Sequence, residues 1–171
     1  MHVSKVRIEN YRAIRKAEVE FKDGVNVVVG DNEAGKSTLL EAIQLAITGQ
    51  LGGRSIRYQL HPYLFNQDAA REFAAAVAAR KPQSPPEIRI EVFFDDDNAL
   101  VRLRGTNNST REEATGVCLR IKVAEGCGAE FADYVMGSSD DELVPVEFFD
   151  VDQRRQEQPE PWPVEMVSAP S

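Results

Sequence analysis

The sequence predicts an α/β fold built around a phosphate-binding loop. Three observations predict it: a valine-rich run at residues 25–29, a glycine-containing loop motif at residues 30–37, and a helical pattern at residues 36–48. Strand, loop and helix in this order place backbone N–H groups and the start of a helix around one anion. The second half of the chain returns to an apolar and polar alternation, which predicts antiparallel strands. We therefore expect one α/β domain with a mixed and antiparallel sheet.

The first 29 residues favour β structure. Val3, Val6 and Ile8 lie in one short strand pattern, and a second alternating run covers residues 17–22. Asp23-Gly24 is a turn signal. The valine-rich run that follows predicts a buried central strand ending at Gly30.

The pattern becomes helical from Lys36 to Thr48, where apolar residues recur at three- and four-residue spacing. Gly49 is placed to end this helix. Residues 50–67 predict a long loop, and Asp68 is a candidate cap for a second helix from Ala69 to about Arg80. A proline-rich break follows.

Four apolar runs in the second half predict antiparallel strands, with a short helix at Ala129–Met136 before the last of them. The runs are Ile88–Phe94, Leu100–Leu103, Val117–Val123 and Val144–Phe148. From Gln153 onward the chain is rich in Pro, Glu and Gln, which predicts a flexible tail. We expect a domain over residues 1–152 and a tail over residues 153–171.

The composition limits location and partners. The 171 residues carry a net charge of −8, and 42% of them are apolar. This length suffices for one domain with a hydrophobic core. Because the sequence has neither an apolar run of about 18 residues nor a signal-peptide core at its start, we expect a cytoplasmic protein with no membrane partner. DNA contacts need clustered Lys and Arg, so we expect them to come from regions outside this chain. The two cysteines predict reduced thiols.

Residues Gly30 to Ser37 match the pattern G-x-x-x-x-G-K-[ST]. Its glycines allow backbone conformations in which amide groups wrap a phosphate, and the following helix directs its positive end at the same anion. Lys36 is expected to reach the β- and γ-phosphates of ATP and to be the catalytic residue, while the Ser37 hydroxyl is expected to ligate Mg²⁺. ATP and Mg²⁺ are therefore the predicted cofactors. Further residues expected to contact the nucleotide are Asn32, Glu33, Ala34, Gly35 and Thr38.

Three segments together resemble the amino-terminal end of the RecF/SMC/OLD group of ABC-type ATPases: Val6–Ile14, Phe21–Asn26 and Gly30–Thr38. Within that group, the loop residues from Asp31 to Ala34 are most similar to OLD-family ATP-dependent endonucleases. The resemblance implies a P-loop NTPase fold of the ABC-ATPase head type, present in part, which would pair with a second ATPase head around two ATP molecules. It also implies that Arg12 approaches the nucleotide phosphates; a solvated turn residue is the alternative. In the OLD family a carboxy-terminal Toprim nuclease cuts DNA with metal ions.

An ABC-type ATPase also needs a Walker B segment and a signature motif. In the best imitation of Walker B, Val92–Asp96, the apolar run that should precede the acidic pair is interrupted by Arg89 and Glu91, so the segment predicts a half-exposed strand followed by a hairpin turn. Leu51-Gly52-Gly53 lies too close behind the first helix for a signature, and it predicts a helix-ending loop. Gln153 is a candidate Q-loop residue, with a surface glutamine as the alternative. We expect the Walker B, signature and Toprim regions to lie outside this chain.

These observations leave two functions open. The first is the ATP-binding portion of an OLD/RecF/SMC-like ATPase in DNA processing, poorly active alone because Walker B and the partner's signature would supply the catalytic groups. The second is a non-catalytic module in which ATP only orders a dimer. A small P-loop kinase or GTPase is disfavoured, because a hairpin precedes the loop and no Asn-Lys-x-Asp guanine reader is present.

Overall fold

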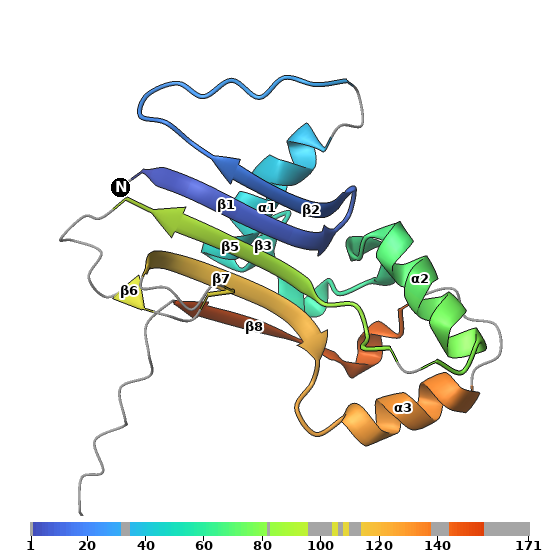
Figure 1. The fold of residues 1–171 in the computed structure, drawn as a ribbon. Helices are drawn as coiled ribbons and strands as arrows, with labels where there is room; N and C mark the ends of the chain where they lie inside the picture. Colours follow the sequence, from blue (N-terminus) through green and yellow to red (C-terminus); the bar gives the residue numbers. More distant parts are fainter. Residues whose placement is uncertain are drawn as a thin grey trace, which may run out of the picture.

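A computed structural model describes residues 2–31, 35–81, 83–95, 104–105, 108–109, 114–137 and 144–155. In these residues the chain forms one six-stranded sheet with helices around it (Figure 1). The strand order is β2-β1-β5-β7, and β7 also pairs with the short β6 and with β8. The predicted α/β fold class is confirmed. All pairings between the described strands of this sheet are antiparallel.

The amino-terminal hairpin forms one side of the sheet. Strand β1 (Val3–Tyr11) pairs with β2 (Ile14–Glu20) and, on its other side, with β5 (Ile88–Phe94). This register sets Ile8 beside Ile90. Because residues paired across strands point to the same face, the buried residues Val6, Ile8, Ile90 and Val92 share one face of the sheet.

The sheet continues from β5 to β7 (Ala114–Val123) and then to β8 (Phe149–Arg155). Ile90 lies opposite Leu119, so the apolar row on β1 and β5 extends onto β7. Strand β6 (Arg104–Gly105) pairs with the beginning of β7. The buried row crosses the sheet and is the surface on which the first helix packs.

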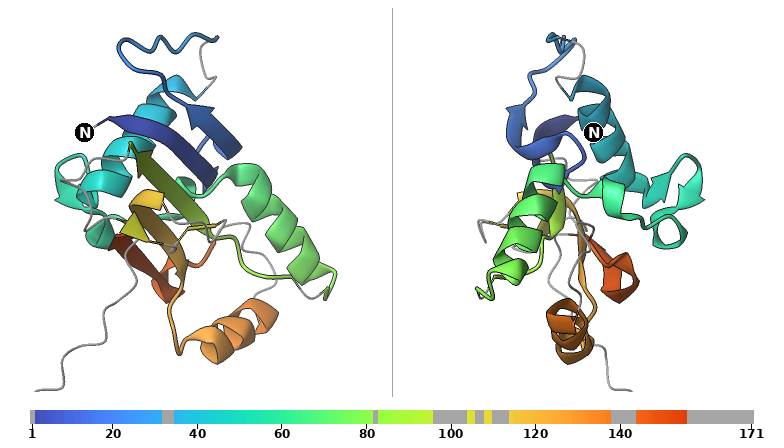
Figure 2. Two further views of the ribbon diagram at one scale, coloured as in Figure 1. Left: turned by 60° about the vertical axis from the view of Figure 1, so that its left-hand side comes forward. Right: turned by 90° about the vertical axis from the view of Figure 1, so that its right-hand side faces the viewer.

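Helix α1 (Lys36–Thr48) covers this apolar face (Figure 2). Its buried residues recur at helical spacing: Leu39, Ala42, Leu45 and Ala46. The predicted apolar set was Leu39, Leu40, Ile43, Ala46 and Ile47, and it is only partly right, because Leu40 and Ile47 are exposed. The helix ends where Gly49 adopts φ 66° and donates its N–H to the Leu45 carbonyl. Both predicted ends of α1 are confirmed.

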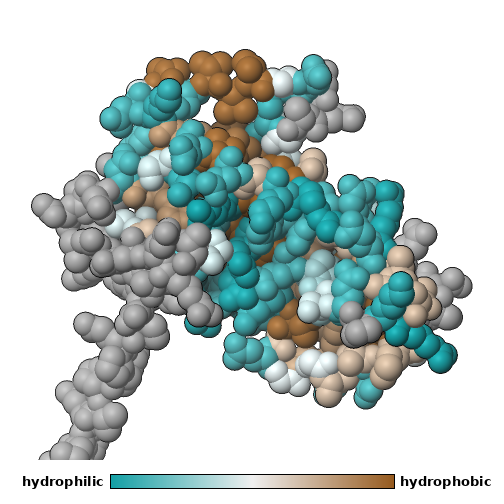
Figure 3. All heavy atoms as spheres, viewed as in Figure 1, coloured by the Kyte–Doolittle hydropathy of each residue, from teal (hydrophilic) through white to brown (hydrophobic). Residues whose placement is uncertain are grey.

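The opposite face of the sheet is largely hydrophilic (Figure 3). It carries ion pairs, such as Arg7 of β1 with Glu18 of β2, and Arg120 of β7 with Glu87 just before β5. Phe93 is buried on this face, with Lys5 and Arg7 above its ring. Because cations and carboxylates alternate here, this face has no extended patch of one charge sign among the described residues.

Two further helices pack at one end of the sheet. Helices α2 (Gln67–Ala78) and α3 (Gly128–Gly137) are joined by Phe73 and Phe131, whose ring centroids lie 6.0 Å apart. Phe131 also packs edge-on against Phe149 of β8. The predicted short helix at Ala129–Met136 is confirmed as α3.

The predicted start of the second helix is wrong by two residues. Helix α2 begins at Gln67 because the side chain of Asn66 caps it, accepting the N–H of Ala69 at 3.3 Å. Asp68, the predicted cap, lies inside the first turn. The preceding segment holds short elements rather than a plain loop: β3 (Gln50–Leu51), β4 (Arg54–Ser55), and 3₁₀ turns at Ile56–Tyr58 and Pro62–Leu64.

The predicted buried strand at residues 25–29 is also wrong. This segment forms no strand, and Val25, Val27 and Val29 are 92%, 77% and 84% exposed. It appears as the brown arch at the top of Figure 3. A strand is stabilised by hydrogen bonds to a neighbour, and no described strand pairs with this segment. The apolar residues therefore remain in contact with solvent.

The last predicted strand lies later in the chain than expected. Val146–Phe148 forms a 3₁₀ turn, closed by the Phe148 N–H on the Pro145 carbonyl, and β8 begins only at Phe149. Residues 153–155 belong to β8 rather than to a tail. Residues 156–171, the run at 100–103 and the turn beyond Asp95 lie outside the described residues.

Among the described residues, the helices are too short or too polar to cross a bilayer. Cys118 and Cys127 are free thiols, as predicted.

Candidate phosphate-binding site

The loop meets α1 at Gly35. This residue adopts φ 82°, a left-handed conformation that favours glycine, and a Cβ built there would lie 3.3 Å from Cγ1 of Ile14. Gly35 caps α1 without a side-chain hydrogen bond, and the first turn contains no acidic residue. The positive end of α1 therefore has no carboxylate partner within that turn and is available to a bound anion.

Lys36 closes the loop on itself. Its Nζ donates hydrogen bonds to the carbonyls of Gly30 and Asp31, at 2.6 and 2.7 Å. The ammonium thus lies at the mouth of the loop, where the motif requires a cation for the phosphates. Asn32, Glu33 and Ala34, which were predicted to contact the nucleotide, lie outside the described residues.

A pocket of about 670 Å³ opens beside this junction. The predicted residues Arg12, Gly35, Lys36, Ser37 and Thr38 all line it. Its other walls come from the β1–β2 turn and from the start of α2: Ala13, Tyr63, Phe65, Asn66, Gln67 and Asp68. The fold therefore brings Arg12, far from the loop in sequence, to the same cavity as Lys36.

The backbone of Arg12 is held in place by the segment before α2. The Arg12 N–H donates to the Leu64 carbonyl at 2.8 Å, and the Asn66 amide donates to the Arg12 carbonyl at 2.8 Å. Arg12 itself adopts φ 47°. These bonds fix the point from which its side chain leaves the β1–β2 turn, against the wall of the pocket.

The Arg12 side chain forms an ion pair with α1. Its Nε lies 2.7 Å from Oε1 of Glu41, although the Nε–H does not point at this oxygen and makes no hydrogen bond. The hydroxyl of the buried Tyr11 donates to the same oxygen. Burial, followed by the bond to Glu41, raises the pKa of Tyr11 above its usual range, so this hydroxyl remains a donor at physiological pH.

Comparison with known proteins identifies the fold to which this site belongs. A model of the AAA domain family matches residues 5–160, most of the chain. The chain belongs to the AAA domain family.

Two kinds of curated relative resemble this AAA domain locally. Over 45 residues it is 53% identical to the DNA double-strand break repair Rad50 ATPase of Methanopyrus kandleri, a match to 26% of this chain and 5% of that protein. Over 43 residues it is 46% identical to the DNA replication and repair protein RecF of Bacillus thuringiensis and of Bacillus cereus, a match to 25% of this chain and 12% of those proteins. The matches thus cover a small part of the relatives' length. The domain is a RecF/SMC/Rad50-like ABC-type ATPase domain, which confirms the broader resemblance; the OLD family stays a prediction.

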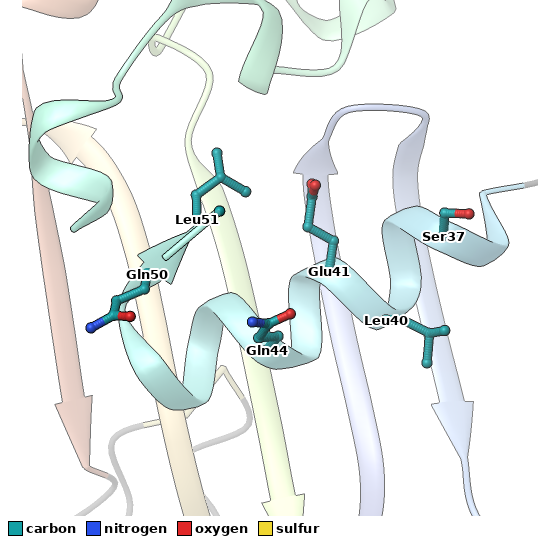
Figure 4. A pocket seen from close by; sticks show the side chains of 7 residues that line it. Ser37, Leu40, Glu41, Gln44, Gln50 and Leu51 are labelled. Carbon is teal, nitrogen blue, oxygen red and sulfur yellow. The ribbon is translucent and has the colours of Figure 1, made fainter. Parts of the chain in front are cut away.

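A second pocket of this AAA domain lies along α1 (Figure 4). It measures about 430 Å³ and is lined by Ser37, Leu40, Glu41, Gln44, Gln50, Leu51 and Gly52. None of its lining residues in the described part of the chain is Lys or Arg, whereas the larger pocket has Lys36 and Arg12. The larger pocket is therefore the one suited to a polyphosphate.

Gln153 does not lie at the loop. Its side-chain amide donates to the Ala46 carbonyl at 2.8 Å and so caps the carboxyl end of α1. Ser37 lies at the other end of the helix, roughly 13 Å away at 1.5 Å per residue. Gly49 leaves room for this contact, since a Cβ there would lie 2.5 Å from Gln153 Oε1. The structure places Gln153 as a helix cap rather than as a Q-loop residue.

The Walker B imitation is also remote from the pocket. Phe94 pairs with Val3 at the start of β1, and Asp95 bonds to His2 at 2.9 Å. Arg12 follows the other end of β1, roughly 30 Å along a nine-residue strand. Asp95 therefore does not face the loop in this AAA domain.

Sequence reasoning missed three residues around the site: Glu41, Tyr63 and Asn66. Glu41 lies four positions after Ser37, so helical spacing alone would have placed it one turn behind the loop. Tyr63 and Asn66 reach the pocket through the bridge between Tyr11 and Phe65, which no local pattern encodes.

Proposed function

We propose that this AAA domain binds ATP with Mg²⁺ in the larger pocket and is the ATP-binding portion of an ATPase that acts in DNA processing. The observation that carries this proposal is the convergence of Lys36 and Arg12 on one cavity at the uncapped amino end of α1. Two cations and a free helix start are what a polyphosphate needs, because each offers positive charge or N–H donors to its oxygens.

The residues present suit the two cofactors. In this proposal Lys36 contacts the β- and γ-phosphates, Arg12 contacts a phosphate from the β1–β2 turn, and the amides of Gly35 and Thr38 contribute with those of Asn32, Glu33 and Ala34. The Ser37 hydroxyl, on the pocket wall, ligates Mg²⁺, which would neutralise phosphate charge during hydrolysis. Tyr63 is 63% exposed on the same pocket and offers an aromatic face on which a base can stack.

Hydrolysis requires groups beyond this pocket. Among the described residues that line the pocket, Asp68 has the one carboxylate. It is exposed, and its Oδ1 lies 3.7 Å from Nη1 of Arg71 on the same helix. In the proposal, Walker B and signature residues come from the remainder of the ATPase head and from a second head. Lys36 stabilises charge on the transferred phosphate but does not activate water, so the 171-residue chain alone turns over slowly.

The exposed valines favour this reading of an incomplete head. Residues 25–29 run straight into the loop, yet their side chains meet solvent. A neighbouring strand from the rest of the head would satisfy their backbone groups and bury these side chains. We propose that this strand carries Walker B.

The action on DNA is proposed from the likeness to relatives named for DNA double-strand break repair and for DNA replication and repair. The finer proposal, an OLD-type ATP-dependent endonuclease in phage defence or repair, rests on the loop residues from Asp31 to Ala34. With a net charge of −8, DNA contact would be made by regions outside this chain.

Calorimetric titration with Mg²⁺-ATP tests the binding proposal. Lys36→Ala should weaken binding by about tenfold or more, because it removes a charged donor to the phosphates. Equal affinities of the wild type and the variant would refute the site. An ATPase assay separates the alternative function, a non-catalytic dimerisation module: turnover that depends on both Mg²⁺ and Lys36 excludes it.

A further inference from the structure

Glu41 links α1 to the β1–β2 turn. It lies one helical turn after Ser37, and its side chain points from α1 toward that turn, away from Leu40 (Figure 4). Its Oε1 receives the Tyr11 hydroxyl and lies 2.7 Å from Arg12 Nε. The side chains of Glu41 and Arg12 are each about one-third exposed. Of the two, Arg12 lines the larger pocket, and Glu41 is not among the described residues that line it.

We propose that Glu41 is the positioning residue for Arg12: it holds the guanidinium by its Nε side against the phosphate pocket. The proposal rests on the ATP-binding function proposed above. It assigns Glu41 no contact with the nucleotide itself, because Glu41 reaches the site only through Arg12.

The need for such a residue follows from how Arg12 is held. Its backbone is fixed by a bond to the Leu64 carbonyl and a bond from the Asn66 amide, but these leave its long side chain free to rotate. An arginine that must be ordered by the ligand binds it less tightly, since the loss of rotamer freedom opposes binding. Pairing with Glu41 orders the side chain beforehand.

Tyr11 fixes the carboxylate in turn. Its ring is fully buried, its hydroxyl bonds to Glu41, and the Arg12 guanidinium carbon lies 5.8 Å from the ring centroid. Tyr11 thus contacts both members of the pair, and its own position is set by the sheet core. The arrangement transmits the rigidity of β1 to a side chain on the pocket wall.

A purely electrostatic role for Glu41 would change the ATP affinity in the opposite direction when its charge is removed. A carboxylate near a polyphosphate repels it, so neutralising Glu41 would tighten ATP binding whether or not Arg12 were present. A positioning role predicts weaker binding, and only when Arg12 is there to be positioned. The two roles are therefore separated by a double-mutant cycle.

The experiment measures Mg²⁺-ATP affinity by calorimetry for the wild type, Glu41→Gln, Arg12→Ala and the double variant. Glutamine keeps an oxygen for the Tyr11 hydroxyl and removes the charge. We expect Glu41→Gln to weaken ATP binding by about three- to tenfold in the wild-type background. Added to Arg12→Ala, the same substitution should leave the ATP affinity unchanged or raise it slightly. Glu72→Gln is the matched control: it removes another arginine–carboxylate pair, with Arg15, that does not line the pocket, and it should leave the affinity unchanged.

Tighter or unchanged binding in Glu41→Gln, or the same loss in both backgrounds, would overturn the positioning role. If Glu41→Gln does not fold, Tyr11→Phe is the deciding variant, because it leaves both charges in place. It should also weaken ATP binding, but by less than Glu41→Gln. Wild-type affinity in Tyr11→Phe would then contradict the proposal. If the wild type binds ATP no better than Lys36→Ala does, the proposed function is overturned as well. Binding by the wild type with an inert Glu41→Gln would overturn this inference alone.

Discussion

Lys36 Nζ lies 2.6 Å from the carbonyl oxygen of Gly30, six residues earlier in the chain. The cation that the motif provides for phosphate therefore also bonds to the loop's own backbone. In the proposed function, the charged oxygens of a nucleotide would replace these bonds with stronger, charge-assisted ones. The bond also ties the first residue of the loop to the start of α1.

Removing this ammonium should loosen the loop without unfolding the domain. We expect Lys36→Ala to change the free energy of unfolding by no more than about 0.5 kcal/mol, because both bonds are solvent-exposed. Amide exchange at Asp31 should become faster. Hydrogen exchange with mass spectrometry checks this, and a large drop in global stability would contradict it.

Gly35→Ala should lower the free energy of unfolding for two separable reasons. The left-handed backbone disfavours alanine by about 1 kcal/mol or more, and the new methyl would press on Ile14. Gly24→Ala is a matched control, with φ 87° and no heavy atom within 4 Å of the added Cβ. Urea denaturation of both variants isolates the Ile14 contact as the difference. Equal losses would show that Ile14 moves aside freely.

The exposed valines should contribute little to the stability of this chain. Val27→Lys is expected to change the free energy of unfolding by less than about 0.5 kcal/mol and to reduce self-association, because that side chain is 77% exposed. Ile90→Ala, at a fully buried site, should cost about 2–5 kcal/mol. Thermal and urea unfolding with light scattering measure both effects. A strongly destabilised Val27→Lys would mean that this segment is buried in solution.

Gln153→Ala should affect folding and not nucleotide binding. The substitution removes the donor to the Ala46 carbonyl and should cost about 0.5–1.5 kcal/mol. Mg²⁺-ATP affinity should stay at the wild-type value, since the contact lies at the far end of α1 from Ser37. A selective loss of affinity with unchanged stability would restore the Q-loop interpretation.

Cys118 should be inert at neutral pH and should make stability depend on pH in alkali. Burial, followed by the nearby Glu91 carboxylate, raises the pKa of Cys118 to about 12 from 9.0. Because this folded-state pKa is above the unfolded one, the stabilisation is complete below about pH 9 and is lost as the pH rises toward 12. Alkylation at pH 8 should label Cys127 and spare Cys118, and Cys118→Ala should flatten the alkaline decline. Rapid labelling of native Cys118 would contradict this.

The elements that the sequence located well are those whose signals are local. Helix α1 runs from Lys36 to Thr48 as predicted, because a left-handed glycine stands at each end and the apolar spacing between them is helical. Strands β5 and β7 follow their period-two alternation. Helix α2 was placed less well, since Asn66 and Asp68 are both good caps by composition, and only the position of the chain at Arg12 selects Asn66.

Local sequence signals were enough to predict the α/β class, the loop that meets α1 at Gly35, and Lys36 and Ser37 as residues of one site, because these depend on backbone preferences and on side chains adjacent in the chain. The family resemblance pointed to Arg12, but the folded chain was needed to show that Arg12 lines the same pocket as Lys36, that Glu41 pairs with Arg12, and that Val25 to Val29 are exposed. An apolar strand is buried only where a neighbouring strand covers it, and an arginine is directed only by the carboxylate that folding brings beside it. Such contacts depend on residues far apart in the chain, and no local pattern records them.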